Sequence, residues 1–199
     1  MDGTSDGELA QRACQGDQAA FGLLVRRYQN AVFDMACRML RDRDAALDAA
    51  QEVFIKAHRS LDRYDDARKF STWLLAITRN HCIDQLRRPA HRLAAPLPDE
   101  SRVPAERRQE PDRVAERTEQ AHLVERAVAE LGDSYREAVE LYHYHDLSYA
   151  EAAEVQGVPL GTFMARLHRA RRQLRDRLRT HLGVGDAEAS DRVDHRKVG

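Results

Sequence analysis

The segment KFSTWLLAITRNHCIDQLRR, residues 69–88, carries an indole, an amide and a guanidinium group at intervals of seven residues. In a helix this spacing drifts by only about 20° per step, so Trp73, Asn80 and Arg87 form one stripe. Such a stripe suits the unstacked bases of single-stranded DNA, because aromatic rings stack on bases, at about 1–3 kcal/mol each, and cations hold phosphates. Trp73 could equally be a core aromatic covered by a neighbouring helix, and the sequence leaves both interpretations open.

The rest of this segment predicts how the helix faces its core. At 100° per residue, one arc is apolar and is expected to be buried: Phe70, Leu74, Leu75, Ile77, Cys82 and Leu86. The opposite arc is polar and is expected to be exposed: Thr72, Arg79, Asn80, Asp84, Arg87 and Arg88.

A second group of cations lies in residues 161–181, which carry seven arginines and one aspartate. Upstream of them, Ser148 and Glu151 form a capping box that opens a short helix. Gly157 can end that helix in a left-handed conformation, and Pro159 suits the first turn of the next one. The pattern predicts a helix-turn-helix whose second helix enters the major groove of DNA. The alternative is an ordinary surface hairpin with solvated arginines.

The composition favours an all-α protein. Charged residues make up 33% of the 199 residues and aromatic residues only 6%, and glycine and proline are sparse. The net charge of −1 hides an asymmetry, since residues 17–88 carry 13 basic and 10 acidic side chains, and residues 98–160 carry 7 and 15. Two basic regions separated by an acidic middle are compatible with nucleic-acid binding, which the net charge alone does not suggest.

Helical periodicity and proline content predict two small helical domains joined by a flexible linker. Five of the six prolines fall in residues 89–117, which show no apolar period. The predicted organisation is a lead (1–16), a first domain (17–88), a linker (89–117), a second domain (118–182) and a disordered tail (183–199). Helices are expected at 17–41, 43–60, 69–88, 118–131 and 133–145, before the helix-turn-helix. Asp17 is the expected N-cap of the first.

No motif predicts catalysis, a cofactor or a metal ion. His143 and His145 are two residues apart and point to different helix faces. No Gly-rich phosphate loop or serine nucleophile elbow occurs. The protein is therefore expected not to be an enzyme.

The sequence also predicts a cytoplasmic protein. The acidic N-terminus has no apolar signal region, and no segment approaches the roughly 20 apolar residues that span a bilayer. The three cysteines form no CxxC pair and are expected to be reduced and mostly buried.

Four stretches occur in an order that resembles a known family: GDQAAFGLLVRRY, DAALDAAQEVFIKAHRSL, KFSTWLLAITRNHCIDQLRR and LSYAEAAEVQGVPLGTFMARLHRARRQL. The chain resembles bacterial RNA polymerase sigma factors of the extracytoplasmic-function (ECF) group. The first domain is similar to sigma region two and the second to sigma region four. The resemblance implies promoter DNA and core RNA polymerase as partners, together with an anti-sigma factor, which in this family is often membrane-anchored.

The resemblance also implies three sets of site residues. The clamp helices of the polymerase β′ subunit would be bound by Asp48, Gln51, Glu52, Phe54 and Lys56. The downstream, minus-ten promoter element would be recognised and opened by Tyr64, Lys69, Trp73, Arg79, Asn80, Arg87 and Arg88. The upstream, minus-thirty-five element would be bound by Thr162, Arg166, His168, Arg169 and Arg172, with the apolar flank of their helix on the β-subunit flap.

The chain departs from the family pattern at three positions. Met164 and Ala165 stand where a Lys or Arg and then a Ser are usual, which predicts an atypical upstream sequence or binding weighted toward phosphates and thymine methyls. Ala49 replaces a usual acidic residue on the polymerase-binding helix. Two other classes remain open: a helix-turn-helix regulator that acts without core polymerase, and a protein–protein module such as an anti-sigma antagonist.

Overall fold

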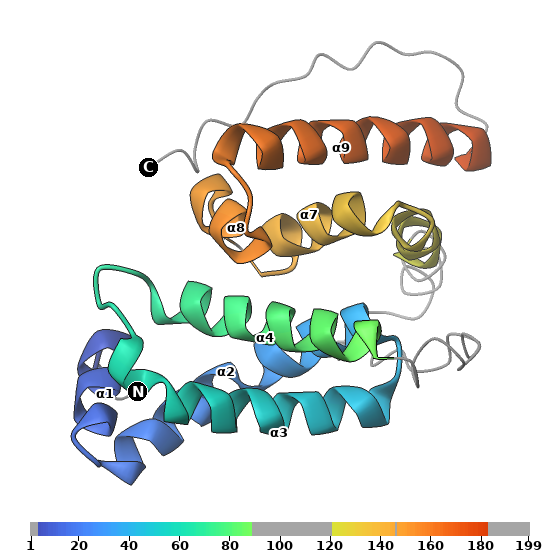
Figure 1. Ribbon diagram of the computed structural model, residues 1–199. Coiled ribbons are helices and arrows are strands. Elements are labelled where there is room, and N and C mark those ends of the chain that lie inside the picture. The colour runs from blue at the N-terminus through green and yellow to red at the C-terminus, as the bar shows by residue number, and fades with distance from the viewer. Residues whose placement is uncertain (1–3, 89–120, 146, 183–199) are drawn as a thin grey trace, which may run out of the picture. The chain divides into compact units, whose positions relative to one another are not determined.

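The protein is described by a computed structural model over residues 4–88, 121–145 and 147–182 (Figure 1). The chain divides into two compact units, and the boundary between them falls between residues 103 and 104. The regular elements of the described residues are all helical, so the predicted all-α class is confirmed. The predicted linker and tail lie outside the described residues.

The first unit is built around one long helix. Its elements are α1 (Asp6–Cys14), α2 (Gln18–Leu40), α3 (Arg43–Arg59), the 3-10 helix η1 (Leu61–Arg63) and α4 (Phe70–Arg87). Helix α2 packs against α1, α3 and α4. The predicted N-cap of α2 is confirmed, since the Ala20 N–H donates to Asp17 Oδ1 over 3.0 Å. Asp42 Oδ1 caps α3 in the same way.

Helix α1 was not predicted, because residues 1–16 were expected to be a lead. Ser5 and Glu8 form a capping box at its start. The helix buries Leu9, Ala10 and Ala13 in the core of the first unit. The sequence signal was the Ser-x-x-Glu spacing, but a nine-residue helix depends on such packing for its stability.

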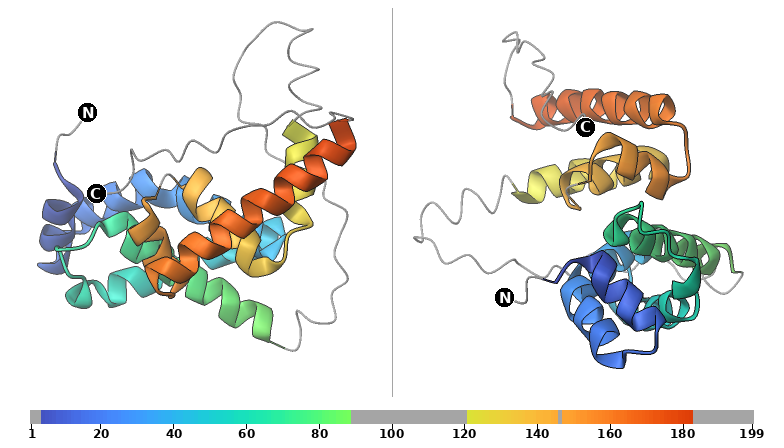
Figure 2. Two further views of the ribbon diagram at one scale, coloured as in Figure 1. Left: turned by 90° about the horizontal axis from the view of Figure 1, so that it is seen from above. Right: turned by 90° about the vertical axis from the view of Figure 1, so that its left-hand side faces the viewer.

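The second unit contains the predicted helix-turn-helix. Residues 121–129 are helical, and α7 (Asp133–His143), α8 (Tyr149–Gln156) and α9 (Leu160–Leu182) follow. The capping box of α8 is confirmed, since the Ser148 N–H donates to Glu151 Oε2 over 2.8 Å. Gly157 is left-handed with φ 67°, as predicted. Helix α9 lies against α7 and α8 (Figure 2) and buries Phe163, Leu167 and Ala170.

The cysteines differ in exposure. Cys14 is exposed, contrary to the expectation of mostly buried thiols, whereas Cys37 is half-buried and Cys82 is buried. Burial raises the pKa of the Cys82 thiol to about 12. All three are free thiols. Among the described residues, no helix is both long and apolar enough to cross a membrane.

Candidate nucleic-acid and polymerase interfaces

Aromatic side chains cluster where α4 begins. The Trp73 ring centroid lies 5.3 Å from that of Tyr64 and 5.4 Å from that of Phe70. Phe70 is buried, whereas Tyr64 and Trp73 are half-buried. The Tyr64 hydroxyl donates to the Arg68 carbonyl over 2.7 Å, which closes the loop between η1 and α4. Trp73 therefore combines the two interpretations of the sequence: one part of the indole packs against the core and the other reaches solvent.

The stripe along α4 continues from this cluster. Asn80 and Arg87 are exposed, as is Arg88, which follows the helix. At 1.5 Å per residue, Asn80 lies about 10 Å and Arg87 about 21 Å along the helix from Trp73. Arg79 is half-buried, and Lys69 is exposed at the N-cap. The predicted downstream residues thus form an aromatic group at one end of α4 and cations along it.

Two residues of α4 contradict the predicted faces. Thr72, expected to be exposed, has 1% of its surface accessible, and Leu86, expected to be buried, has 40%. The buried residues of α4 extend from Phe70 to Cys82, so the last turn, which holds Leu86, lies beyond the packed part of the helix. The angular pattern predicted the helix but not where along its length the neighbouring helices cover it.

A polar contact joins α3 to α4 through His81, which follows Asn80 on α4. Lys56 Nζ lies 2.7 Å from His81 Nδ1, and the Gln85 amide nitrogen lies 3.0 Å from His81 Nε2. An ammonium can only donate, so Nδ1 accepts and the neutral ring carries its proton on Nε2. Turning the Gln85 amide by 180° then lets its oxygen accept that proton. Burial, and next the charge of Lys56, lower the pKa of His81.

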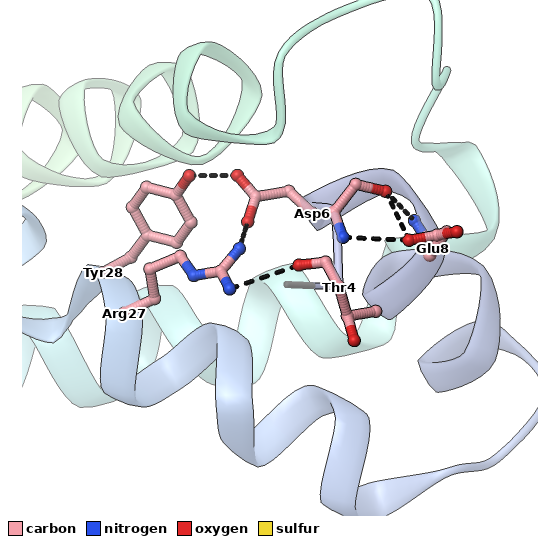
Figure 3. A network of polar contacts seen from close by, with 6 residues as sticks. Thr4, Asp6, Glu8, Arg27 and Tyr28 are labelled. Carbon is pink, nitrogen blue, oxygen red and sulfur yellow. Dashed lines mark hydrogen bonds and ion pairs between the residues drawn. The ribbon is translucent and has the colours of Figure 1, made fainter. Parts of the chain in front are cut away.

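Helix α1 is linked to the aromatic cluster through Tyr28 of α2. The Asp6 carboxylate accepts hydrogen bonds from the Arg27 guanidinium and the Tyr28 hydroxyl, both on α2 (Figure 3). Arg27 also donates to the Thr4 carbonyl over 3.3 Å. Burial and then the Asp6 hydrogen bond raise the pKa of Tyr28. Because the Tyr28 ring lies 5.6 Å from Phe70, these contacts link the N-terminal helix to the aromatic cluster.

The outer face of α3 carries three of the five expected polymerase residues and two further exposed apolar side chains. Asp48, Gln51 and Glu52 are exposed, whereas Phe54 is half-buried against the core and Lys56 reaches His81. Leu47 and Ile55 are also exposed, at 45% and 42%. They stand four residues before and after Gln51, so the three side chains share one face. The available signal was that these two large apolar residues lie outside the face of α3 that holds the buried Ala46, Ala49, Val53 and Ala57.

In the second unit, the outer face of α9 points away from the core. Arg172 lies 180° around the helix from buried Phe163, and Thr162, His168, Arg169 and Arg172 are all exposed. Met164 is 46% exposed. The remaining expected residue, Arg166, is half-buried and donates from Nη1 to Gln156 Oε1 of α8 over 3.1 Å. No group of three or more possible metal ligands is found in the described parts of the chain.

The fold and these surfaces define a class: an all-helical, two-unit protein with a helix-turn-helix in one unit and an aromatic surface beside cations in the other. Comparison with known proteins identifies the family. The family models "Sigma-70 region 2" and "Sigma-70, region 4" match residues 24–92 and 121–174. The chain is 35% identical over 173 residues to the ECF RNA polymerase sigma factor SigW of Bacillus subtilis, covering 83% of this chain and 92% of the relative.

A second relative gives the same result. The ECF RNA polymerase sigma-E factor of Escherichia coli is 34% identical over 180 residues, covering 84% of this chain and 91% of that protein. The chain therefore belongs to the ECF group of RNA polymerase sigma factors. It directs RNA polymerase in promoter recognition and transcription initiation, and it is a non-enzymatic subunit, so both predictions are confirmed. Family membership excludes the two other classes that the sequence left open.

Solved structures share the fold. CnrH, solved in complex with the cytosolic domain of CnrY, is 28% identical with a TM-score of 0.65, covering 89% of this chain and 99% of that one. The sigma factor RpoE of Bartonella quintana, solved with the anti-sigma factor NepR, is 23% identical with a TM-score of 0.64, covering 80% and 96%.

Proposed function

We propose that the two units divide promoter recognition between an opened strand and a duplex. The first unit, which includes α1 in addition to residues 17–88, binds and opens the minus-ten element. The single observation that carries this proposal is the half-exposed Trp73, backed by Phe70 and flanked by Tyr64. A base removed from the duplex can stack on such a ring. Asn80 presents an amide to a base edge, and Lys69, Arg79, Arg87 and Arg88 follow the phosphates.

The second unit, residues 118–182, binds the minus-thirty-five element as a duplex. Thr162, His168, Arg169 and Arg172 share the exposed face of α9, opposite its core side. A helix presented in this way enters the major groove, where cations contact phosphates and the N-terminal residues approach base edges. The apolar flank of this helix contacts the polymerase β flap.

The outer face of α3 is the proposed docking surface for the β′ clamp helices. Asp48, Gln51 and Glu52 supply polar contacts, and Leu47 and Ile55 add apolar area on the same helix. Ile55→Ser should weaken binding to core polymerase about tenfold, measured without DNA. Leu86→Ser, which removes an equally exposed apolar side chain from α4, should leave core binding unchanged. Equal effects of the two substitutions would contradict this surface.

Run-off transcription with bacterial core polymerase tests the division between the units. Asn80→Ala should reduce strand opening, seen as loss of permanganate reactivity of thymines in the minus-ten region, while upstream protection persists. Arg169→Ala should weaken upstream protection. Asn30→Ala and Arg126→Ala are matched controls on exposed positions outside both surfaces. A loss of upstream protection in Asn80→Ala with normal opening would reverse the assignment.

The chain is also proposed to act in the cytoplasm under an anti-sigma factor. Core polymerase is cytoplasmic in bacteria, and the similar CnrH was solved with the cytosolic domain of CnrY. A protein cross-linked to this chain in cells and then purified should suppress run-off transcription by this holoenzyme in a dose-dependent manner. A captured protein without that effect is not the antagonist.

A further inference from the structure

A buried amide joins all three helices around the helix-turn-helix. Gln156, the last residue of α8, is only 2% exposed. Its Nε2 donates to the Ser134 carbonyl over 3.0 Å and to Glu137 Oε2 over 3.1 Å, both on α7. Its Oε1 accepts from Arg166 Nη1 of α9 over 3.1 Å. Both polar atoms of this buried amide, Nε2 and Oε1, therefore have hydrogen-bond partners within the protein.

The charges on the two sides of this amide match its dipole. The amide oxygen faces the guanidinium of Arg166, and the amide nitrogen faces the carboxylate of Glu137. Hydrogen bonds to ionised partners are stronger than those between neutral groups. Since Gln156 directly precedes the left-handed Gly157, the contact acts at the turn that sets the direction of α9.

The position of Arg166 on α9 agrees with this role. It lies one turn from Phe163 and one turn from Ala170, both fully buried, so it borders the core side of the helix. Arg169 and Arg172 are exposed on the outer face. Arginines that look alike in the sequence therefore differ in what they contact.

We propose that Arg166 does not contact DNA and instead acts, through Gln156 and Glu137, as a positioning residue that holds α9 at the angle needed to enter the major groove. The outer arginines, Arg169 and Arg172, carry the phosphate contacts. This inference rests on the proposed binding of the upstream element by the second unit.

The test compares salt dependence in the complete holoenzyme. The probe is a promoter duplex selected by the wild-type holoenzyme from a library randomised in the upstream element. Removing one contact between a cationic side chain and a phosphate flattens the slope of log K against log salt by about one unit. Arg169→Gln should therefore weaken binding and flatten the slope. Arg166→Gln should weaken binding about tenfold and leave the slope unchanged.

Gln156→Met supplies the second arm, because no DNA group can reach a side chain that is buried. It should weaken upstream binding as Arg166→Gln does, and the double variant should be no weaker than either single variant. Glu137→Gln, which keeps an amide oxygen as acceptor, should have a smaller effect. Thermal unfolding followed by circular dichroism verifies that each variant is folded. Binding is measured well below the melting temperature, because a contact that only stabilises the fold would not affect affinity there.

Three results would overturn the inference: a flattened slope for Arg166→Gln equal to that of Arg169→Gln, additive effects in the double variant, or full binding by folded Gln156→Met. If Gln156→Met does not fold, the slope of Arg166→Gln and the response of Glu137→Gln still decide. A wild-type holoenzyme that selects no upstream sequence would instead refute the proposed function of the second unit, and this inference with it.

Discussion

The two units present their proposed nucleic-acid surfaces in different ways. In the first unit, Tyr64 and Trp73 belong both to that surface and to the packing around buried Phe70. In the second unit, Arg169 and Arg172 lie on the face of α9 that points away from buried Phe163. In the first unit the same side chains therefore serve packing and binding, whereas in the second unit the proposed phosphate contacts come from side chains outside the core.

The physical reason for the difference lies in the DNA that each unit is proposed to bind. An opened strand offers apolar base faces, and the aromatic groups that stack on them also favour burial. A duplex offers phosphates, and guanidinium groups that bind them remain hydrated outside the core. The stability of the first unit can be followed separately, because Trp73 is the only tryptophan of the chain and its fluorescence reports on that unit.

The largest effect is expected from removing the central ring of each core. Phe70→Ala should lower the free energy of unfolding of the first unit by about 3–5 kcal/mol, because truncation leaves a cavity. Urea unfolding followed by Trp73 fluorescence measures it. Phe163→Ala should cost a similar amount but appear only in circular dichroism. A shift of the tryptophan transition by Phe163→Ala would show that the two cores do not unfold independently.

Trp73→Ala tests whether one side chain contributes both to stability and to binding of the opened strand. The half-buried indole should contribute about 2 kcal/mol to stability, and its loss should weaken binding of the opened strand by about 1–3 kcal/mol. Arg169→Ala should change stability by no more than about 0.5 kcal/mol and still reduce promoter binding. Circular dichroism gives stability in both variants. Unchanged stability in Trp73→Ala would remove the distinction between the units.

Met164→Lys tests the second unit by adding a cation to the exposed surface of α9. Met164 is 46% exposed on α9, so a lysine there can reach a phosphate without disturbing the core. Upstream binding should strengthen several-fold, and the salt slope should steepen by about one unit. The measurement is a titration of promoter DNA at fixed salt and again over a salt series. Gln29→Lys adds the same charge at an exposed position of α2 and should have no such effect.

The smallest effect concerns acid sensitivity of the first unit. The pKa of His81 is lowered in the folded state, so below its ordinary value of 6.5 the unfolded chain binds a proton that the folded chain excludes. This contribution to stability is present above pH 6.5 and is lost as the pH falls through the folded pKa. In His81→Gln, the fluorescence-detected urea midpoint should depend less on pH between about 7.5 and 5.5. Identical pH dependence in the wild type and the variant would contradict a lowered pKa of His81 in the folded state.

Local signals predicted most elements of the fold. The caps at Asp17 and Ser148 and the left-handed Gly157 are short-range features, and all three are present. Helix α1 was missed although its capping box was readable, because a helix of nine residues forms only when its apolar side is buried. Leu47 and Ile55, which belong to the proposed polymerase surface, were not predicted, because the apolar period of α3 indicates which side faces the core and not which exposed side chains bind a partner.

Short-range sequence features were enough to predict most of the helices, the caps at Asp17 and Ser148, the helix-turn-helix and the concentration of arginine in α9, since these depend on residues within a few positions of one another. The packing of the helices against one another determines which side chains are exposed and can contact a partner. It buried Thr72 and exposed Leu86, placed Trp73 partly inside an aromatic cluster, and joined Arg166 to Gln156. A helical period gives the direction of a face, but only the neighbouring helices determine how far that face is covered.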